Sequence, residues 1–274
     1  MNQTNFPVHK KHPTIFSIIT VCLNAGDSLL QTINSILIQD FIDFEIIVKD
    51  GFSTDGFFEK VPEDKRIIKI QTKDTGIYDA MNQALECTNG QYVLFLNAGD
   101  FFYDSSVLGS FYEAIINNNF PGLVYCDYKT TGLGEYVQSP PKLTNFFLFR
   151  TMLCHQVCMI KREFYDSLGK FDTTFKVDSD YDFLLRLLIV QKARYIHIQK
   201  LGIISTSFGF SFQNKELAKK EVSRIRKKYF QKKYFTYNLV LALTLPSFRN
   251  KIANSSGLAP KLYQKLANFF NHQF

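Results

Sequence analysis

Four short strings of acidic and amide residues each follow an apolar run within the first 100 residues. The strings are Thr20-Val21-Cys22-Leu23-Asn24, Val48-Lys49-Asp50-Gly51-Phe52-Ser53-Thr54-Asp55, Asp74-Thr75-Gly76-Ile77-Tyr78-Asp79-Ala80-Met81-Asn82 and Phe95-Leu96-Asn97-Ala98-Gly99-Asp100. Carboxylate and amide oxygens suit hard divalent cations such as Mg²⁺ and Mn²⁺, and they also accept hydrogen bonds from polar ligands. A later string, Asp178-Ser179-Asp180-Tyr181-Asp182, offers carboxylates that suit general base catalysis.

The apolar periodicity predicts which elements hold these strings. Period-two or continuous apolar runs predict strands over 16–21, 44–48, 67–71 and 92–96, whereas helical spacing predicts helices over 29–37, 77–85 and 107–115. Strands that alternate with helices indicate an α/β fold, with a mostly parallel sheet and helices on both faces.

Three carboxylates fall just beyond predicted strands. Asp50 follows the second strand, Asp74 the third and Asp100 the fourth. Any one of them is better explained as a turn or cap residue. Together they indicate a ligand crevice, because such sheets bind ligands beyond the carboxyl ends of their strands.

The rest of the chain shows a looser pattern. Strands are predicted over 123–125, 157–160 and 195–198, and a helix over 181–190. A basic helix is predicted over 214–235, with an apolar stripe of Ala218, Val222, Ile225 and Tyr229.

Charge is distributed unevenly along the chain. Residues 1–200 hold 19 basic and 23 acidic residues, whereas residues 201–274 hold 13 basic and 2 acidic residues. A helix packed on the domain would explain the basic segment, and so would an interfacial one. In the second case the Lys219 to Lys233 cluster meets anionic lipid. The apolar residues that would then enter the interface are Phe235, Leu239, Leu241, Leu243 and Leu245.

Other protein classes lack support in the sequence. There is no G-x-x-x-x-G-K-[ST] loop, G-x-G-x-x-G turn or G-x-S-x-G elbow, and no recognisable nucleic-acid module. The longest strongly apolar run, 235–245, is too short to span a bilayer, and the N-terminus has no apolar signal region. We therefore expect a cytoplasmic protein, peripheral on the inner face of the plasma membrane if the basic segment binds lipid.

Taken in register with Gly169-Lys170-Phe171-Asp172 and the 178–182 string, the four strings resemble the family 2 glycosyltransferases. The resemblance covers about residues 14–210 and is strongest to the bacterial branch that builds capsular, exopolysaccharide and lipopolysaccharide chains. It implies the GT-A fold and inverting, metal-dependent sugar transfer from a nucleotide sugar to a saccharide or lipid-linked acceptor. A UDP-sugar is favoured as donor, with GDP- or dTDP-sugars as alternatives.

The same resemblance implies roles for individual residues. Asp180 is the base, with Asp178 and Asp182 as nearby alternatives, and Asp100 is the ligand of Mn²⁺ or Mg²⁺. Asp50 contacts the nucleobase. The residues expected along the rest of the donor are Cys22, Leu23, Asn24, Asp74, Asp79, Asn82, Asn97 and Ala98, and those on the acceptor or diphosphate side are His155, Gln156 and Ser179. For Asp79, Asn82 and His155 a purely structural role is about equally compatible with the sequence.

The predicted organisation has three parts. Residues 1–13 form a polar tail, residues 14–212 the GT-A domain, and residues 213–274 a basic amphipathic helical extension. Within the domain, a nucleotide-binding half extends to about residue 100 and an acceptor half follows. Two other functions stay open at this point, a sugar-phosphate nucleotidyltransferase and a noncatalytic membrane-binding module.

Overall fold

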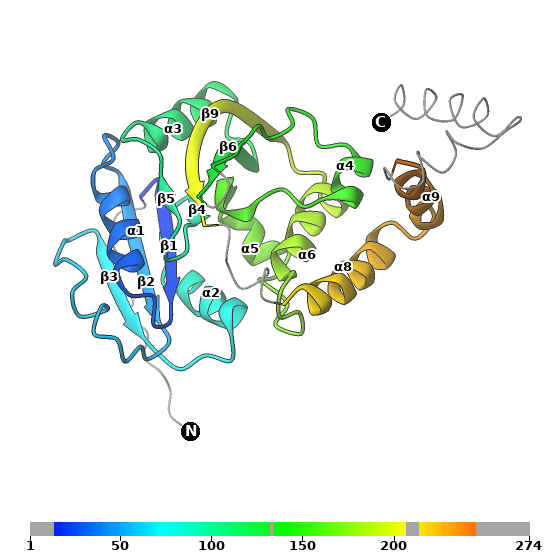
Figure 1. Ribbon diagram of the computed structural model, residues 1–274. Helices are drawn as coiled ribbons and strands as arrows, with labels where there is room; N and C mark the ends of the chain where they lie inside the picture. Colours follow the sequence, from blue (N-terminus) through cyan, green and yellow to red (C-terminus); the bar gives the residue numbers. More distant parts are fainter. Residues whose placement is uncertain (1–13, 132–133, 207–213, 245–274) are drawn as a thin grey trace, which may run out of the picture.

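The computed structural model describes residues 14–131, 134–206 and 214–244 (Figure 1). Strands and helices alternate through the N-terminal half, as the apolar periodicity predicts. Its elements are β1 (Phe16–Cys22), α1 (Asp27–Leu37), β2 (Phe44–Asp50), β3 (Ile67–Gln71), α2 (Ile77–Leu85), β4 (Tyr92–Phe95), β5 (Phe101–Phe102) and α3 (Val107–Asn117).

The second half mixes short helices with longer strands. Its elements are β6 (Leu123–Thr130), β7 (Tyr136–Val137), α4 (Asn145–Arg150), the 3-10 turn η1 (His155–Val157), β8 (Cys158–Lys161), α5 (Glu163–Ser167), α6 (Ser179–Leu185), the π-helical η2 (Arg186–Val190), β9 (Tyr195–Ser205), α8 (Lys215–Tyr229) and α9 (Tyr234–Thr244).

One sheet runs through the domain in the order β3-β2-β1-β4-β8-β6-β9-β5. The first four strands are parallel, with Phe16 of β1 opposite both Phe44 of β2 and Tyr92 of β4. β8 runs antiparallel to β4 and β6, whereas β6 and β9 are parallel. The carboxyl ends of β1, β2 and β4 therefore meet at one edge of the sheet.

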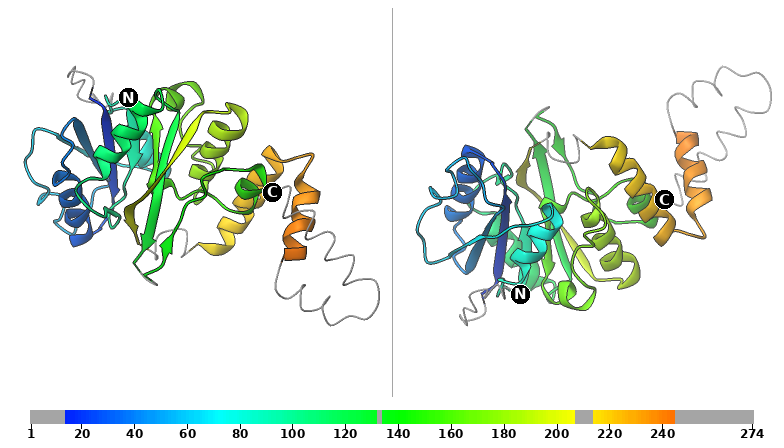
Figure 2. Two further views of the ribbon diagram at one scale, coloured as in Figure 1. Left: turned by 90° about the horizontal axis from the view of Figure 1, so that it is seen from above. Right: turned by 90° about the horizontal axis from the view of Figure 1, so that it is seen from below.

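Helices cover both faces of the sheet. α1 and α3 lie on one face, where Gln39 after α1 accepts a hydrogen bond from Leu108 N at 3.0 Å (Figures 1 and 2). α2, α5 and α6 lie on the other, where Tyr165 stacks on Phe183 with ring centroids 4.4 Å apart. The strands β1, β2 and β4 are buried almost throughout, as expected for a sheet covered on both sides.

The basic segment packs on the domain through α8. Ile225 is fully buried, and Val222 and Tyr229 are partly buried against the core, which confirms the predicted stripe. The predicted helix over 214–235 is interrupted, because α8 ends at Tyr229 and α9 begins at Tyr234. α9 buries Tyr237 and Val240 and leaves Phe235 and Leu239 exposed.

The predicted strands and helices of the first half are confirmed, and so is the α/β class. The structure extends the strand expected over 195–198 to Ser205, because β9 pairs with β6 at 195–197 and, after a register shift, again between Leu201 and Ser205. It also assigns residues 186–190, expected as ordinary helix, to a π-helical turn. The polar N-terminal tail and the residues after 244, including Leu245, lie outside the described residues.

Candidate functional site

A cavity of about 620 Å³ opens beyond the carboxyl ends of β1 and β4. Its walls come from the loop after β4, from the turn η1 and from the first turn of α6. Predicted site residues that line it are Cys22, Leu23, Asn97, Ala98, Asp100, His155, Gln156 and Asp180. The fold thus brings together residues up to 158 positions apart in sequence, and we call this the main cavity.

The loop of residues 97–100 is fixed by hydrogen bonds to α1. The hydroxyl of Thr32 donates to the backbone oxygen of Asp100 at 2.8 Å and accepts from the backbone N–H of Gly99 at 2.9 Å. Gly99 has φ of 101°, a left-handed conformation that glycine adopts without strain. This turn directs the Asp100 side chain into the main cavity.

Asp100 is almost fully buried, with 3% of its surface exposed. Its Oδ1 accepts hydrogen bonds from the backbone N–H of Thr206 at 2.8 Å and from the Thr206 hydroxyl at 3.3 Å. Its Oδ2 accepts from Gln156 Nε2 at 3.0 Å. Burial raises the pKa of Asp100, and these hydrogen bonds oppose the rise. The carboxylate is held by Thr206, which follows β9, and by Gln156 of η1, and it does not cap a helix.

Asp180 and His155 form an ion pair in the wall of the same cavity. His155 Nδ1 lies 2.8 Å from Asp180 Oδ2. Asp180 Oδ1 accepts from the Tyr78 hydroxyl and from the backbone N–H of Tyr181, both at 2.9 Å. Burial lowers the pKa of His155, but the hydrogen bond to Asp180 and the charges of Asp180 and Asp100 raise it overall. Burial and the charge of Asp180 raise the pKa of Tyr78 well above its usual value.

Asn97, which lies two residues beyond the end of β4, faces His155 of this pair. Its amide nitrogen lies 3.4 Å from His155 Nε2, while its Oδ1 is buried without a hydrogen-bond partner. An unpaired buried oxygen costs free energy unless a ligand supplies the missing partner. This oxygen is therefore available to accept a hydrogen bond from a ligand or to bind a cation.

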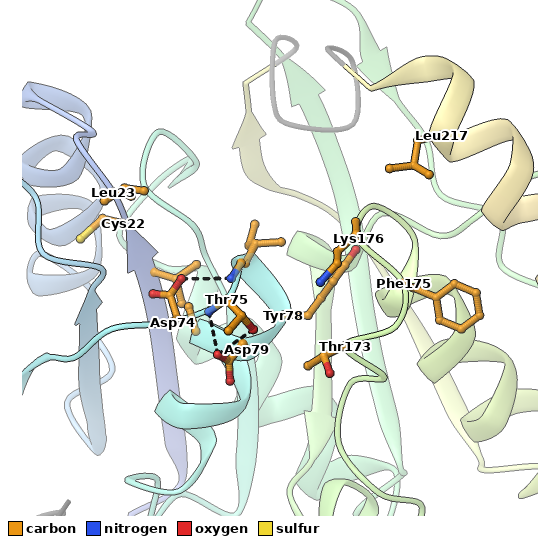
Figure 3. Close-up of a pocket in the computed structure, with 14 residues that line it drawn as sticks. Cys22, Leu23, Asp74, Thr75, Tyr78, Asp79, Thr173, Phe175, Lys176 and Leu217 are labelled. Atoms are coloured by element: carbon orange, nitrogen blue, oxygen red, sulfur yellow. Dashed lines mark hydrogen bonds between the residues drawn. The ribbon is translucent and has the colours of Figure 1, made fainter. Parts of the chain in front are cut away.

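A second cavity of about 550 Å³ adjoins the main cavity and shares Cys22, Leu23 and Tyr78 with it. In Figure 3 the N-terminus of α2 forms one side, with Asp74, Thr75 and Asp79, and the loop of Thr173, Phe175 and Lys176 forms the other. Leu217 of α8 also lines it. Backbone N–H groups at a helix N-terminus favour anions, and here Asp79 and Asp74 already accept hydrogen bonds from those of Thr75 and Gly76.

Hydrogen bonds fix the carboxylates of this second cavity. Asp74 Oδ2 pairs with the fully buried Lys49 at 2.7 Å. Asp79 Oδ2 accepts from the backbone N–H of Thr75 at 2.8 Å, and although burial raises the pKa of Asp79, the bonds to Thr75 lower it overall. Leu23 is 61% exposed where the two cavities meet.

Four predicted residues do not line these two cavities. Asp50 is fully buried and accepts hydrogen bonds from Ser53 and Gln71, which lower its pKa although burial raises it. Asn24 Oδ1 accepts a hydrogen bond from the backbone N–H of Thr54 at 2.8 Å. Asn82 makes two hydrogen bonds with the backbone of Phe171. Ser179 is buried with its hydroxyl unpaired. Their roles in ligand binding stay predictions.

Several residues around the site were not singled out from the sequence. Tyr78 and Thr206 donate hydrogen bonds to Asp180 and Asp100, respectively. Lys49 forms a salt bridge with Asp74. A lysine inside an apolar strand is a detectable signal, because such a charge needs a buried partner. Tyr78 and Thr206 gave no such signal, since their partners are over 100 residues away.

Comparisons with known proteins agree with this geometry. The profile of glycosyl transferase family 2 matches residues 17–220. A PGL/p-HBAD biosynthesis glycosyltransferase of Mycobacterium bovis is 30% identical over 203 residues, which cover 67% of this chain and 74% of the relative. TuaG of Bacillus subtilis, named for teichuronic acid biosynthesis, is 30% identical over 54% of this chain and 63% of its own.

Solved structures show the same fold at low sequence identity. S. aureus TarS 1–349 in complex with UDP superposes with a TM-score of 0.65 at 18% identity, covering 88% of this chain and 75% of that one. The mannosyltransferase PcManGT from Pyrobaculum calidifontis, in complex with GDP-Man and Mn²⁺, has a TM-score of 0.62 at 17% identity. The match covers 94% of this chain and 81% of PcManGT. Sequence match, fold and strand-end site agree, and the chain belongs to glycosyl transferase family 2.

Proposed function

We propose that this glycosyltransferase transfers a sugar, with inversion, from a nucleoside diphosphate sugar to a saccharide or lipid-linked acceptor in bacterial surface polysaccharide synthesis. The observation that carries the proposal is the position of Asp100 and Asp180 on one cavity. One carboxylate is available for the diphosphate side and the other for the acceptor side.

The side chains around Asp100 fit a divalent cation that binds together with the donor. Among residues 14–131, 134–206 and 214–244, no group of three or more His, Cys, Asp or Glu side chains could hold a metal by itself. Mg²⁺ is commonly bound by one or two carboxylates plus substrate phosphates. Asp100 would hold the cation, with the unpaired oxygen of Asn97 beside it. Mn²⁺ or Mg²⁺ bound there would neutralise charge on the departing diphosphate.

Asp180 is suited to take the proton of the acceptor hydroxyl. As that oxygen bonds to the anomeric carbon, the bond from this carbon to the diphosphate breaks, and the diphosphate leaves with the electron pair. Asp180 Oδ2 has His155 as its partner, and Oδ1 is held by Tyr78 and its own helix. Its carboxylate is therefore fixed in orientation, as proton transfer at a defined position requires.

The donor is proposed to extend from the second cavity into the main cavity. The N-terminus of α2 and the side chains of Cys22 and Leu23 would then contact the nucleotide. TarS is solved with UDP and with UDP-GlcNAc, which supports a UDP-sugar, while the GDP-Man complex of PcManGT leaves a GDP-sugar as the alternative. The names of the mycobacterial relative and of TuaG support an acceptor of the cell surface.

A role at the cytoplasmic face of the membrane is a further part of the proposal. No helix among the described residues is both long and apolar enough to cross a bilayer. Phe235 is 80% and Leu239 50% exposed on α9, close in sequence to a basic groove on α8. The groove, which we call the basic face, is lined by Glu216, Lys219, Lys220, Ser223, Arg224 and Lys227. Exposed apolar residues beside lysines favour anionic lipid surfaces. Leu241 packs against the core, which corrects its assignment to that surface.

The test is a transfer assay of the full chain with UDP-, GDP- and dTDP-sugars, with Mn²⁺ or EDTA, and NMR assignment of the product anomer. We expect one donor class to react, the anomeric configuration to invert, and EDTA to stop the reaction. Asp180→Asn should lower turnover by about 10²-fold or more while nucleotide affinity stays unchanged. Retained turnover in Asp180→Asn would exclude it as the base, and a retained configuration would exclude inversion.

A further inference from the structure

One buried carboxylate in the basic C-terminal segment faces the catalytic domain. Glu221 lies on α8 on the same side as Ile225, and only 7% of its surface is exposed. Its Oε1 accepts a hydrogen bond from the backbone N–H of Lys176 at 2.8 Å. Its Oε2 accepts from the backbone N–H groups of Val177 at 2.9 Å and Asp178 at 3.1 Å.

These three N–H groups belong to the segment that leads into α6. Asp178 precedes the first residue of α6, and Asp180 follows two positions later. The Tyr78 hydroxyl has one proton, which it shares between Asp180 Oδ1 and the backbone oxygen of Val177. The segment held by Glu221 is thus bonded to the residues that hold Asp180.

The bonds from Glu221 are of a strong kind. Successive backbone N–H groups form a concave site for a negative charge, and charge-assisted hydrogen bonds are about twice as strong as neutral ones. Burial increases the cost of losing such a carboxylate, because three N–H donors would be left without partners.

A second set of contacts holds α6 from the end of α8. Lys228 Nζ and the Tyr229 hydroxyl each lie 2.9 Å from Asp182 Oδ1. Asp182 Oδ2 in turn accepts from Arg186 Nε at 3.0 Å. The helix α8 therefore holds the chain on both sides of Asp180, at Asp178 and at Asp182.

We infer that Glu221 is a positioning residue for sugar transfer, which makes α8 part of the catalytic site. The inference rests on the proposed function, in which Asp180 is the base. Glu221 fixes the backbone of residues 176–178 so that Asp180 and Tyr78 keep their places in the main cavity. The loop after β4 with Asp100 makes none of these bonds, whereas Lys176, whose N–H bonds to Glu221, also lines the second cavity.

The test compares Glu221→Gln and Glu221→Ala in the full chain. Glutamine has the size of glutamate and keeps one accepting oxygen. Glu221→Gln should therefore lose less kcat than Glu221→Ala. We expect kcat to fall by about tenfold or more in Glu221→Ala, since small misplacements of catalytic groups cost up to about 10²-fold. The donor KM and the Kd of the nucleotide, measured by calorimetry, should change by less than kcat does, because Glu221 bonds only to backbone N–H groups and its own side chain lines neither cavity.

The control is Glu113→Ala on α3. Glu113 is exposed and lines neither cavity nor the basic face, so kcat should not change. Unchanged kcat in both Glu221 variants would overturn the inference, as would an equal loss of kcat and nucleotide affinity. Asp180→Asn, assayed alongside, distinguishes a failure of the Glu221 inference from a failure of the proposed base. If it loses turnover while the Glu221 variants do not, only the role of Glu221 fails, and if it retains turnover, the proposed base fails.

Discussion

His155 Nδ1 lies 2.8 Å from Asp180 Oδ2, and the two side chains share the wall of the main cavity. An ionised carboxylate only accepts hydrogen bonds, so Nδ1 carries the proton and Nε2 faces Asn97. The imidazole thereby fixes one oxygen of Asp180, while Tyr78 fixes the other. This relationship places the orientation of the proposed base under the control of two neighbours.

Replacing His155 should affect turnover more than binding. His155→Ala removes the donor to Asp180, and we expect kcat to fall by about tenfold to 10²-fold because the carboxylate loses its orientation. His155→Asn, whose amide can still donate, should keep more activity. Steady-state kinetics and nucleotide calorimetry measure both effects. His197→Asn is the matched control, because His197 pairs with Asp127 at 2.7 Å outside both cavities. Equal losses in the control would show that any buried His–Asp pair has this effect.

Asp100→Asn should remove the metal dependence of nucleotide binding. A ligand at about 100 times its Kd stabilises by about 2.7 kcal/mol, which raises Tm by several degrees. We expect Mn²⁺ to increase this shift for UDP in the original chain and to have no effect in Asp100→Asn. Asp64→Asn is the control, since Asp64 pairs with Arg66 away from the cavities. A Mn²⁺ effect that persists in Asp100→Asn would place the cation elsewhere.

Asp178 makes the stability of the fold depend on pH. Burial raises its pKa from 3.8 to about 7, and the charges of Asp180 and Glu221 add to the rise. The folded chain therefore binds this proton more tightly than the unfolded chain, so the group lowers stability as pH rises from about 4 to 7. We expect Asp178→Asn to raise Tm at pH 8 by about 2 °C or more and to flatten the decrease between pH 4 and 7. Calorimetric scans across this range check it, and an unchanged slope would contradict it.

The exposed apolar residues of α9 provide a test of lipid binding. Phe235→Ser with Leu239→Ser removes two exposed apolar side chains, so sedimentation with anionic liposomes should weaken by about tenfold. The same change at Tyr237 or Val240 would disturb the core and is not a suitable test. Exposed Ile42, in the loop between α1 and β2, serves as the control through Ile42→Ser. Equal binding by both variants would exclude α9 as the contact surface.

Replacing two glycines by alanine should change the free energy of unfolding in opposite directions. A Cβ at Gly90 would lie 2.7 Å from the backbone carbon of Phe16, where nothing can yield, so Gly90→Ala should cost about 1–3 kcal/mol. Gly109 in α3 has open space around its Cβ position, so Gly109→Ala should stabilise by up to about 1 kcal/mol. Thermal or urea unfolding measures both values. A stable Gly90→Ala would mean that β1 can move away from this loop.

The first half of the fold was predictable because its signals are local. The apolar runs of β1, β2 and β4 and the helical spacing of α1 and α2 identify each element without knowledge of its partners. The strand-end positions of Asp74 and Asp100 followed from the same pattern, and both reach a cavity. Asp50 also ends its strand, but Ser53 and Gln71 enclose its carboxylate.

The rest depends on contacts between distant residues. β5 and β7 are two-residue strands that pair with β9 and β6, and two apolar residues are too few to predict a strand. The turn of Thr206 toward Asp100 joins chain segments 106 residues apart. Glu221 had a detectable signal, because it falls on the apolar side of α8 near Val222 and Ile225, but its three N–H partners could not be read from that spacing.

The two sides of α8 should respond differently to ionic strength. Charges on the exposed basic face are screened by salt, because the Debye length falls from about 10 Å at 0.1 M to about 3 Å at 1 M. Glu221 is buried against backbone N–H groups that salt does not reach. Raising the salt concentration should therefore release the protein from an anionic surface while leaving the transfer reaction in solution intact.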